Sequence, residues 1–359
     1  MRKIIIFSIL ALITSAMTAC GSEGTSGSDT ETIGISMPTQ SSERWVNDGE
    51  NMVSELEELG YETDLQYGED VVEDQASQIE NMITEGVDAL VIAPIDGEAL
   101  TNVLDMAENS DIPVIAYDRL LMNHEHVSYY ATFDNFEVGV IQGEYIVENL
   151  GLEDGEGPYN IELFAGSPDD NNAYFFWDGA MSVLEPYMES GDLVVRSEQV
   201  DFEQAATPQW SGSDAQERMD NILSSHYSSE ELDAVYSPFD GISLGVISSL
   251  KSVGYGTEDQ PLPLITGQDA DTSSVQSIID GEQTQTIFKD TRELADKAVD
   301  MVDAVINDEE AEVNDTETYD NGEKVVPASL LEPVSVDQSN YEEVLIESGY
   351  YSKEDFEME

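Results

Sequence analysis

The chain has 359 residues, 40% of them hydrophobic, and carries 77 acidic against 12 basic side chains, a formal net charge of −65. This length favours two domains, and the hydrophobic content is sufficient for two buried cores. The charge excludes nucleic acid and anionic lipid surfaces as charge-driven partners, because their phosphates would repel the chain. The acids are spread along the whole sequence between apolar positions, which favours a solvated acidic surface adapted to high salt over an acidic tail or interaction patch.

The N-terminal 19 residues have the features of an export signal. Arg2 and Lys3 precede a short apolar run at 4–13, and mostly small residues at 14–19 lead to Cys20, the only cysteine. The apolar run is too short to persist as a membrane-spanning helix. The segment resembles a bacterial lipoprotein signal, with Met17 where that pattern usually has leucine. We expect a signal peptide at 1–19, lipidation of Cys20, and a flexible tether at 20–30 that anchors the protein outside the cytoplasmic membrane.

From residue 31 the sequence alternates short apolar runs with amphipathic segments. The first half predicts strands at 32–37, 61–67, 88–93 and 112–117, with helices at 44–60, 73–86 and 98–109, followed by an apolar-aromatic run at 127–133. The second half predicts helices at 136–149, 172–189, 213–226, 241–253, 273–279 and 291–306, and strands at 159–165, 193–197, 234–237, 262–266, 284–288 and 325–336, before a C-terminal helix. The periodicity lapses at 199–212, a loop that contains Trp210. This alternation predicts an α/β fold with parallel sheets in two similar lobes, and we interpret 127–133 as a crossover between them.

Charged and amide side chains follow many of the predicted strands. They are Asp118-Arg119, Asp170-Asn171-Asn172, Asp240, Gln268-Asp269 and Lys289, with Arg44-Trp45 just beyond the first strand. The carboxyl ends of parallel strands face the crevice where α/β proteins bind ligands, so these residues are expected at one site. Carboxylates, amides and cations suit a polyol because each hydroxyl both donates and accepts, and the indoles of Trp45 and Trp210 suit the C–H face of a pyranose.

A purely structural interpretation exists for several of these residues. Acids and amides after strands often cap the next helix, which by itself would explain Asp170 or Asp240. Single tryptophans are more often core residues than ligand platforms. However, only ten basic residues follow the signal, and Arg44, Arg119 and Lys289 all lie near strand ends.

Several longer runs resemble one known family. They are SQIENMITEGVDALVIAPIDG (77–97), VIAYDRL (114–120), SYYATFDNFEVG (128–139), GSPDDNNA (166–173), SGSDAQERMDNILS (211–224) and TGQDAD (266–271). In this order they resemble the periplasmic aldose-binding proteins of ABC importers, most closely the multiple sugar-binding, glucose/galactose type, with the xylose-binding proteins next. The resemblance covers nearly all of 32–351.

The resemblance implies a type I periplasmic binding protein fold: two Rossmann-like lobes joined by a three-strand hinge. We expect the N-terminal lobe to comprise 31–133 with 289–325, and the C-terminal lobe 134–288 with 326–359. The residues implied to hydrogen-bond the sugar are Arg44, Asp118, Arg119, Asp170, Asn172, Asp269 and Lys289, and Trp45 and Trp210 are implied to sandwich its ring. Phe239 stands where the xylose-binding relatives carry asparagine, so a strict xylose preference is not expected. Asp240 is either a ligand or a helix cap, and we favour the cap.

The implied function is capture of a monosaccharide, an aldose such as glucose, galactose, arabinose or xylose, by hinge closure. The partners are then an ABC importer permease and, as a second class, a chemoreceptor or sensor kinase. We expect a monomer without cofactor or catalytic activity.

Two other classes of protein deserve comparison. An extracytoplasmic glycosidase could use Asp118 and Asp170 as its carboxyl pair, but Arg119 would hold Asp118 ionised. A sugar-responsive repressor would need a basic helix-turn-helix where this chain has an export signal. The sequence contains no P-loop and no G-x-G-x-x-G, and His124, His126 and His226 do not make a zinc constellation.

Overall fold

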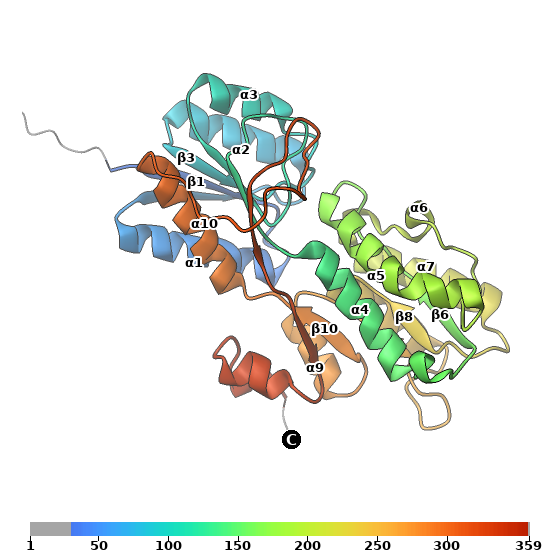
Figure 1. Cartoon of the computed structure of the whole chain (residues 1–359). Coiled ribbons are helices and arrows are strands. Elements are labelled where there is room, and N and C mark those ends of the chain that lie inside the picture. Colours follow the sequence, from blue (N-terminus) through green and yellow to red (C-terminus); the bar gives the residue numbers. More distant parts are fainter. Residues whose placement is uncertain (1–29, 358–359) are drawn as a thin grey trace, which may run out of the picture. The chain divides into compact units, whose positions relative to one another are not determined.

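The computed structural model describes residues 30–357. The expected signal peptide, Cys20 and the tether up to residue 29 lie outside the described residues. Within 30–357, no helix is long and apolar enough to cross a membrane. Strands and helices alternate along this part of the chain, as Figure 1 shows.

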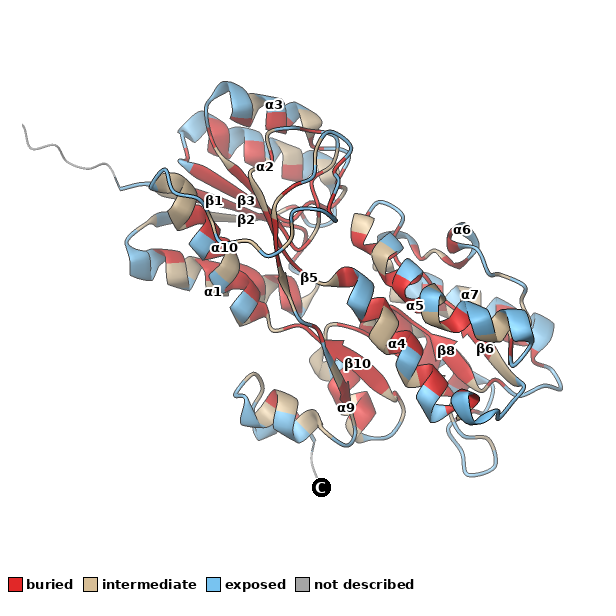
Figure 2. Cartoon of the chain, viewed as in Figure 1, coloured by how far each residue is buried: buried red, intermediate tan, exposed pale blue. Residues whose placement is uncertain are grey.

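The N-terminal lobe is built on a six-stranded sheet in which every neighbouring pair is parallel, with the order β11-β5-β4-β3-β1-β2. Its strands are β1 (Thr32–Met37), β2 (Glu62–Tyr67), β3 (Ala89–Ile92), β4 (Val114–Tyr117), β5 (Tyr129–Phe133) and β11 (Ala328–Leu331). The central strands β3 and β4 read ALVI and VIAY and are buried along their whole length. Such continuous apolar runs are typical of strands covered on both faces, and Figure 2 shows them as buried.

Helices cover both faces of this sheet. They are α1 (Glu43–Leu59), α2 (Val72–Glu85), α3 (Thr101–Asn109) and α10 (Thr291–Ile306). The apolar stripes of α1 and α10 share one hydrophobic core with the sheet, and those of α2 and α3 share another. Helix α1 ends at Gly60, whose φ of 99° is the left-handed conformation that a glycine C-cap supplies.

The C-terminal lobe contains a four-stranded parallel sheet, order β7-β6-β8-β9, and an antiparallel pair, β10-β12. Its strands are β6 (Tyr159–Leu163), β7 (Leu193–Val194), β8 (Ala234–Tyr236), β9 (Leu264–Ile265), β10 (Gln285–Phe288) and β12 (Val334–Asp337). Backbone hydrogen bonds from Thr284 to Ile265 and from Ile287 to Gly267 join β10 to the β9 segment. The antiparallel pair therefore continues the parallel sheet.

Helices surround this second sheet as well. They are α4 (Asn135–Asn149), α5 (Asn171–Ser190), α6 (Phe202–Ala205), α7 (Gly212–His226), α8 (Asp240–Ser252) and α9 (Thr272–Ile279). Short helical turns are η1 (Leu152–Asp154), η2 (Pro208–Trp210), the π-helical η3 (Glu342–Glu347) and η4 (Lys353–Asp355). Helices α4 and α5 approach closely at two glycines, Gly139 and Gly179. A Cβ at either position would lie 2.0 or 2.1 Å from a carbonyl oxygen of the other helix, so a larger residue would not fit. Asp134 caps α4 by accepting a hydrogen bond from Glu137 N.

The chain passes three times between the two sheets: from β5 to α4, from β10 to α10, and from β11 to β12. The predicted strand at 325–336 is wrong as a single element. It is two strands in different sheets, and Pro333, which has no backbone N–H, lies in the break between them. Consequently the last crossing lies between Leu331 and Val334, rather than at the expected boundary of 325 and 326.

Two further predictions differ from the structure. The expected loop at 199–212 contains α6 and η2, and the expected C-terminal helix is replaced by the single turns η3 and η4. Both segments are too short for the helical periodicity on which the predictions rely.

Candidate functional site: a charged cavity at the strand ends

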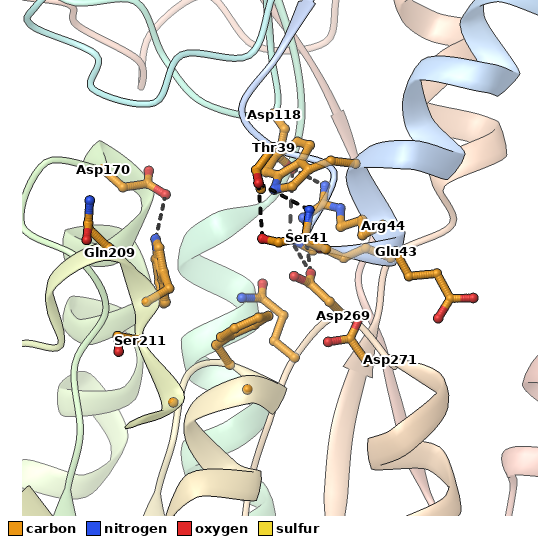
Figure 3. Close-up of a pocket in the computed structure, with 18 of the residues that line it drawn as sticks. Thr39, Ser41, Glu43, Arg44, Asp118, Asp170, Gln209, Ser211, Asp269 and Asp271 are labelled. Carbon is orange, nitrogen blue, oxygen red and sulfur yellow. Dashed lines mark hydrogen bonds and ion pairs between the residues drawn. The ribbon is translucent and has the colours of Figure 1, made fainter. Parts of the chain in front are cut away.

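The carboxyl ends of strands in both lobes line one cavity of about 510 Å³ (Figure 3). It contains all nine residues expected to contact a sugar: Arg44, Trp45, Asp118, Arg119, Asp170, Asn172, Trp210, Asp269 and Lys289. Phe239, the tenth candidate, also lines it, whereas Asp240 does not. Side chains spread over 246 positions of sequence therefore meet in one place, as the strand-end rule predicts.

The local fold explains these positions. Asp118 and Arg119 directly follow β4, Asp269 follows β9, and Lys289 is the first residue after β10. Arg44 lies in the first turn of α1, after β1. Each lies where a parallel strand ends and the chain turns to the next helix.

A buried cluster of alternating charges forms one wall of the cavity. Arg44 is bonded through Nη2 to Asp118 and through Nη1 to Asp269 Oδ1, at 3.1 Å. Lys289 Nζ lies 3.0 Å from the same Asp269 oxygen and 3.8 Å from Asp118 Oδ2. Arg44, Asp118 and Lys289 are at most 6% exposed, so water screens these pairs little.

This pairing fixes the protonation state of the cluster. Burial alone would raise the pKa of Asp118, but Arg44 and Lys289 outweigh it and lower that pKa to about 2. Burial likewise opposes the charge of Arg44, yet Asp118, Asp269 and Asp48 raise its pKa well above the ordinary value. Both groups are therefore charged at neutral pH: Asp118 is an acceptor and Arg44 a donor.

A second ion pair involves residues of both lobes. Arg119 Nε lies 3.0 Å from Asp170 Oδ2, and Trp210 Nε1 donates to that same oxygen at 3.3 Å. Asp170 also accepts from the backbone N–H of Asn172 as the N-cap of α5. Both interpretations of Asp170, the cap and the cavity residue, therefore hold at once.

Asn172 uses its amide within the protein. Its Nδ2 donates to the Asp118 carbonyl at 2.7 Å, and its Oδ1 accepts from Tyr130 and Asn135 at 3.0 and 3.1 Å. The side chain is 2% exposed and fixes the chain around Asp118. The second N–H of this amide makes no hydrogen bond among the described residues.

The two tryptophans have different surroundings. The guanidinium carbons of Arg44 and Arg119 lie 4.8 and 5.2 Å from the ring centroid of Trp45, which is the distance of cation–π contacts. Trp210 is in edge contact with Phe176 and Phe239, at 6.2 and 5.8 Å between centroids. The indole of Trp45 thus packs against cations and that of Trp210 against aromatic rings.

Several cavity residues have strained backbone conformations. Asp118, Trp210 and Asp269 have φ values of 57°, 54° and 92°, in the left-handed region that non-glycine residues rarely adopt. Gln209, another lining residue, has a φ of 53°. Strain of this kind persists where the surrounding structure imposes it, and it is concentrated at functional sites.

Asp240 is neither an exposed ligand nor the cap of its own helix. It is fully buried as the first residue of α8, and the N-cap position is held by Phe239. Its carboxylate accepts from Gln283 Nε2, Thr286 Oγ1 and the backbone N–H of Asp271. The preferred interpretation as a cap is therefore wrong: Asp240 connects α8 to β10 and to the turn that bears Asp269.

Some residues behind and around the charged cluster were not predicted from the sequence. Asp48 lies one helical turn after Arg44, with Oδ2 3.4 Å from Arg44 Nε, and its burial raises its pKa to about 7. The i, i+4 spacing of an arginine and an acid was the signal available in the sequence. Thr39, Ser41 and Asp271 also line the cavity and come from loops, which have no such spacing (Figure 3).

One cluster elsewhere has the composition of a metal site. Oxygens of Asp105 and Glu108 and a ring nitrogen of His124 lie within 4.8 Å of one another. The backbone N–H of His126 donates to His124 Nδ1 at 3.0 Å, so the neutral ring carries its proton on Nε2, facing Asp105 at 3.2 Å. In this tautomer Nε2, the nitrogen that would have to bind a metal, instead donates a hydrogen bond to Asp105.

Comparison with known proteins places this geometry in a family. A family model described as a periplasmic binding protein domain matches residues 33–310. The multiple sugar-binding periplasmic protein SbpA of Azospirillum brasilense is 59% identical over 338 residues, 94% of each chain. The multiple sugar-binding periplasmic receptor ChvE of Rhizobium radiobacter is also 59% identical, over 90% of this chain and 91% of its own.

A solved structure agrees with these relatives. An ABC transporter solute-binding protein from Clostridium phytofermentans, with bound β-D-glucose, is 51% identical and superposes with a TM-score of 0.87. The match covers 90% of this chain and 99% of that one. The expected type I fold of two α/β lobes is thereby confirmed, as is the resemblance to multiple sugar-binding proteins. The chain belongs to the periplasmic binding protein family.

Proposed function

We propose that the protein binds one monosaccharide, an aldose such as glucose, galactose, arabinose or xylose, in the charged cavity. The observation that carries the proposal is the joint lining of that cavity by paired charges and indoles from both lobes. Buried donors and acceptors of fixed protonation state match hydroxyls in both of their roles. The names of the relatives, multiple sugar-binding proteins and a glucose complex, support the same ligand class.

The proposed mechanism is capture by closure of the lobes about the three connecting segments. A ligand that contacts Arg44 and Asp118 on one lobe and Asp170 and Asp269 on the other binds the closed form better than the open one. This differential affinity shifts the population toward the closed form. Closure also removes water, which strengthens each hydrogen bond to the sugar.

The proposed role is delivery of the sugar to the permease of an ABC importer. Presentation of the loaded form to a chemoreceptor or sensor kinase is a second use of the same closed shape. The location that fits both is extracytoplasmic, with a monomer tethered by lipid at Cys20. The N-terminal sequence, with the pattern of an export signal, and the periplasmic relatives support this placement.

The charges in the cavity favour binding over hydrolysis. A glycosidase needs one carboxyl with a raised pKa as acid and a second carboxyl as nucleophile or base. Asp118 is held ionised by Arg44 and Lys289, and Asp170 is paired with Arg119 at 3.0 Å. Burial raises the pKa of Asp170, as a general acid requires, but the Asp118 carboxylate that would have to act beside it is held in ion pairs with Arg44 and Lys289.

Calorimetric titration of the purified protein with D-glucose, D-galactose, L-arabinose and D-xylose in molar KCl tests the proposal, together with mass spectrometry of any ligand retained on purification. We expect one site per chain and no release of product from aryl glycosides. Absence of heat with all four sugars would contradict the aldose assignment, and turnover of an aryl glycoside would favour the glycosidase.

A further inference from the structure

The turn that bears Asp269 is held in an unfavourable conformation by its neighbours. Asp269 and Ala270 both have left-handed φ angles, 92° and 52°, which cost free energy unless the surroundings impose them. The backbone groups of the turn are bonded as follows: Asp240 N to Gln268 O at 3.0 Å, Asp269 N to Ile287 O at 2.8 Å, Ala270 N to Thr286 Oγ1 at 3.2 Å, and Asp271 N to Asp240 Oδ2 at 3.0 Å. All four bonds come from α8 and β10 of the same lobe.

One carbonyl of the turn is bonded from the C-terminal segment of the chain. The hydroxyl of Tyr351 donates to Ala270 O at 3.0 Å, across 81 positions of sequence. Burial raises the pKa of the Tyr351 hydroxyl, so it stays protonated and a donor at all working pH values. The C-terminal segment 341–357 therefore supplies a fifth hydrogen bond to the strained turn.

The neighbouring Tyr350 contacts the segment that bears Lys289. Its ring lies 4.7 Å from that of Phe288, and its hydroxyl lies 3.1 Å from Thr291 Oγ1. These two residues flank Lys289 along the chain. Adjacent tyrosines therefore contact the two segments whose charged ends, Asp269 Oδ1 and Lys289 Nζ, lie 3.0 Å apart.

The C-terminal segment is firmly packed where it makes these contacts. Leu345 and Phe356 are buried in a small core with Phe288 and Val336, and Tyr351 stacks edge-on between Tyr350 and Phe356. Glu357 exchanges two hydrogen bonds with Gln276 of α9. In Figure 1 the segment is drawn in red near α9 and β10.

We propose that the C-terminal segment is a positioning element of the binding site, in which Tyr351 and Tyr350 hold the Asp269 turn and the Lys289 segment so that Asp269 pairs with both Lys289 and Arg44. Among the described residues that line the cavity, neither tyrosine is found. Their effect on a ligand must therefore pass through Asp269 and Lys289. The inference rests on the proposed function, because it takes Asp269 to be a sugar ligand.

Tyr351→Phe is the direct test, because it removes one oxygen and leaves the aromatic packing. We expect binding of D-glucose to weaken roughly threefold to tenfold, the usual effect of one lost hydrogen bond. The matched control is Tyr341→Phe, in the same segment. Among the described residues, the Tyr341 hydroxyl is bonded only to the adjacent Glu342, at 3.4 Å. We expect less than a twofold change in the control. A Tyr351→Phe variant that binds as tightly as the control would overturn the inference.

A double-mutant cycle separates positioning from a general loss of stability. If Tyr351 acts through Asp269, Tyr351→Phe added to Asp269→Asn should weaken binding less than twofold further. The same loss in both backgrounds would show that Tyr351 acts elsewhere and would overturn the inference alone. If Asp269→Asn itself binds glucose normally, then Asp269 is no ligand, and the inference fails together with that part of the proposed site.

Discussion

The cavity and the outer surface of this protein use charge in opposite ways. The whole chain has 77 acids and 12 bases, and acids such as Glu57 and Glu58 of α1 are exposed to solvent. In the cavity, by contrast, each of the cations Arg44, Arg119 and Lys289 has a carboxylate partner. Each cation of the cavity is therefore paired, although Glu43, Asp70 and Asp271 also line it and leave the lining with more acids than bases.

The contrast separates interactions that depend on the solvent from those that do not. Exposed acids act collectively over distances comparable to the Debye length, so salt changes their energy. Buried pairs act over about 3 Å in a medium that ions do not enter, so each depends on its own geometry. Stability should therefore follow the ionic strength, whereas ligand binding should follow individual residues.

The largest expected effect is the loss of one buried partner. Asp269→Ala removes the carboxylate shared by Arg44 and Lys289 and leaves two buried cations without it. We expect sugar affinity to fall on the order of 100-fold, since breaking a buried charged pair typically costs about 2 to 5 kcal/mol. Arg119→Ala should have a similar effect through Asp170. Calorimetry measures both.

The control for this prediction lies on the surface. Lys251 and Glu282 form an exposed pair at 2.5 Å, and such pairs contribute about 0 to 1 kcal/mol. Lys251→Ala should leave sugar affinity unchanged. Equal losses in the buried and exposed variants would remove the contrast between cavity and surface.

The second prediction concerns salt. Raising KCl from 0.1 to 2 M shortens the Debye length from about 10 Å to below 3 Å and should relieve repulsion among the surface acids. We expect the unfolding temperature to rise by several degrees, at about 2 to 4 °C per kcal/mol for a domain of 150 to 250 residues. Sugar affinity, measured on the folded protein at each salt concentration, should change far less. A salt-independent unfolding temperature would argue against the proposed salt adaptation.

The third prediction concerns the aromatic wall. A Cβ at Gly166 would lie 2.0 Å from Cη2 of Trp210, so Gly166→Ala must displace the indole. If Trp210 stacks on the sugar, affinity should fall by about 1 kcal/mol, roughly fivefold. Gly166→Ala introduced together with Trp210→Ala should then reduce the sugar affinity little beyond the loss from Trp210→Ala alone. An equal loss in both backgrounds would mean that Gly166 acts on the fold and not on the platform.

The sequence was sufficient to predict the convergence of the site because topology determines it. Parallel strands end at one edge, so Asp118, Asp269 and Lys289 could be brought together without knowing a single contact. Fold class followed from the same alternation of strands and helices. The fold class and the position of the strand ends are both set by long periodic segments, so the substitution of a single residue does not change them.

Local roles were not predictable in the same way. Asp240 resembles a helix cap in the sequence, yet its carboxylate bonds to Gln283 and Thr286, more than 40 positions away. The end of the hinge was misplaced because only Glu332 and Pro333 separate β11 from β12, too short a break to divide the predicted strand. Both outcomes depend on contacts with residues distant in the sequence, so the local spacing of residues could not predict them.

The smallest expected effect is on the pH dependence of stability. Burial, with Asp269 and Glu43 nearby, raises the pKa of Asp271 at the cavity edge to about 7, above the unfolded value near 4. Between these values the folded state binds more protons than the unfolded one, so the free energy of unfolding should rise as pH falls from 7 toward 4. The slope from one such group is below about 1.4 kcal/mol per pH unit, and Asp271→Asn should remove it. Denaturant titrations at constant KCl between pH 5 and 8 measure the difference. An unchanged slope in Asp271→Asn would indicate that its carboxyl is already ionised at pH 5 and that the edge of the cavity is as well solvated as the outer surface.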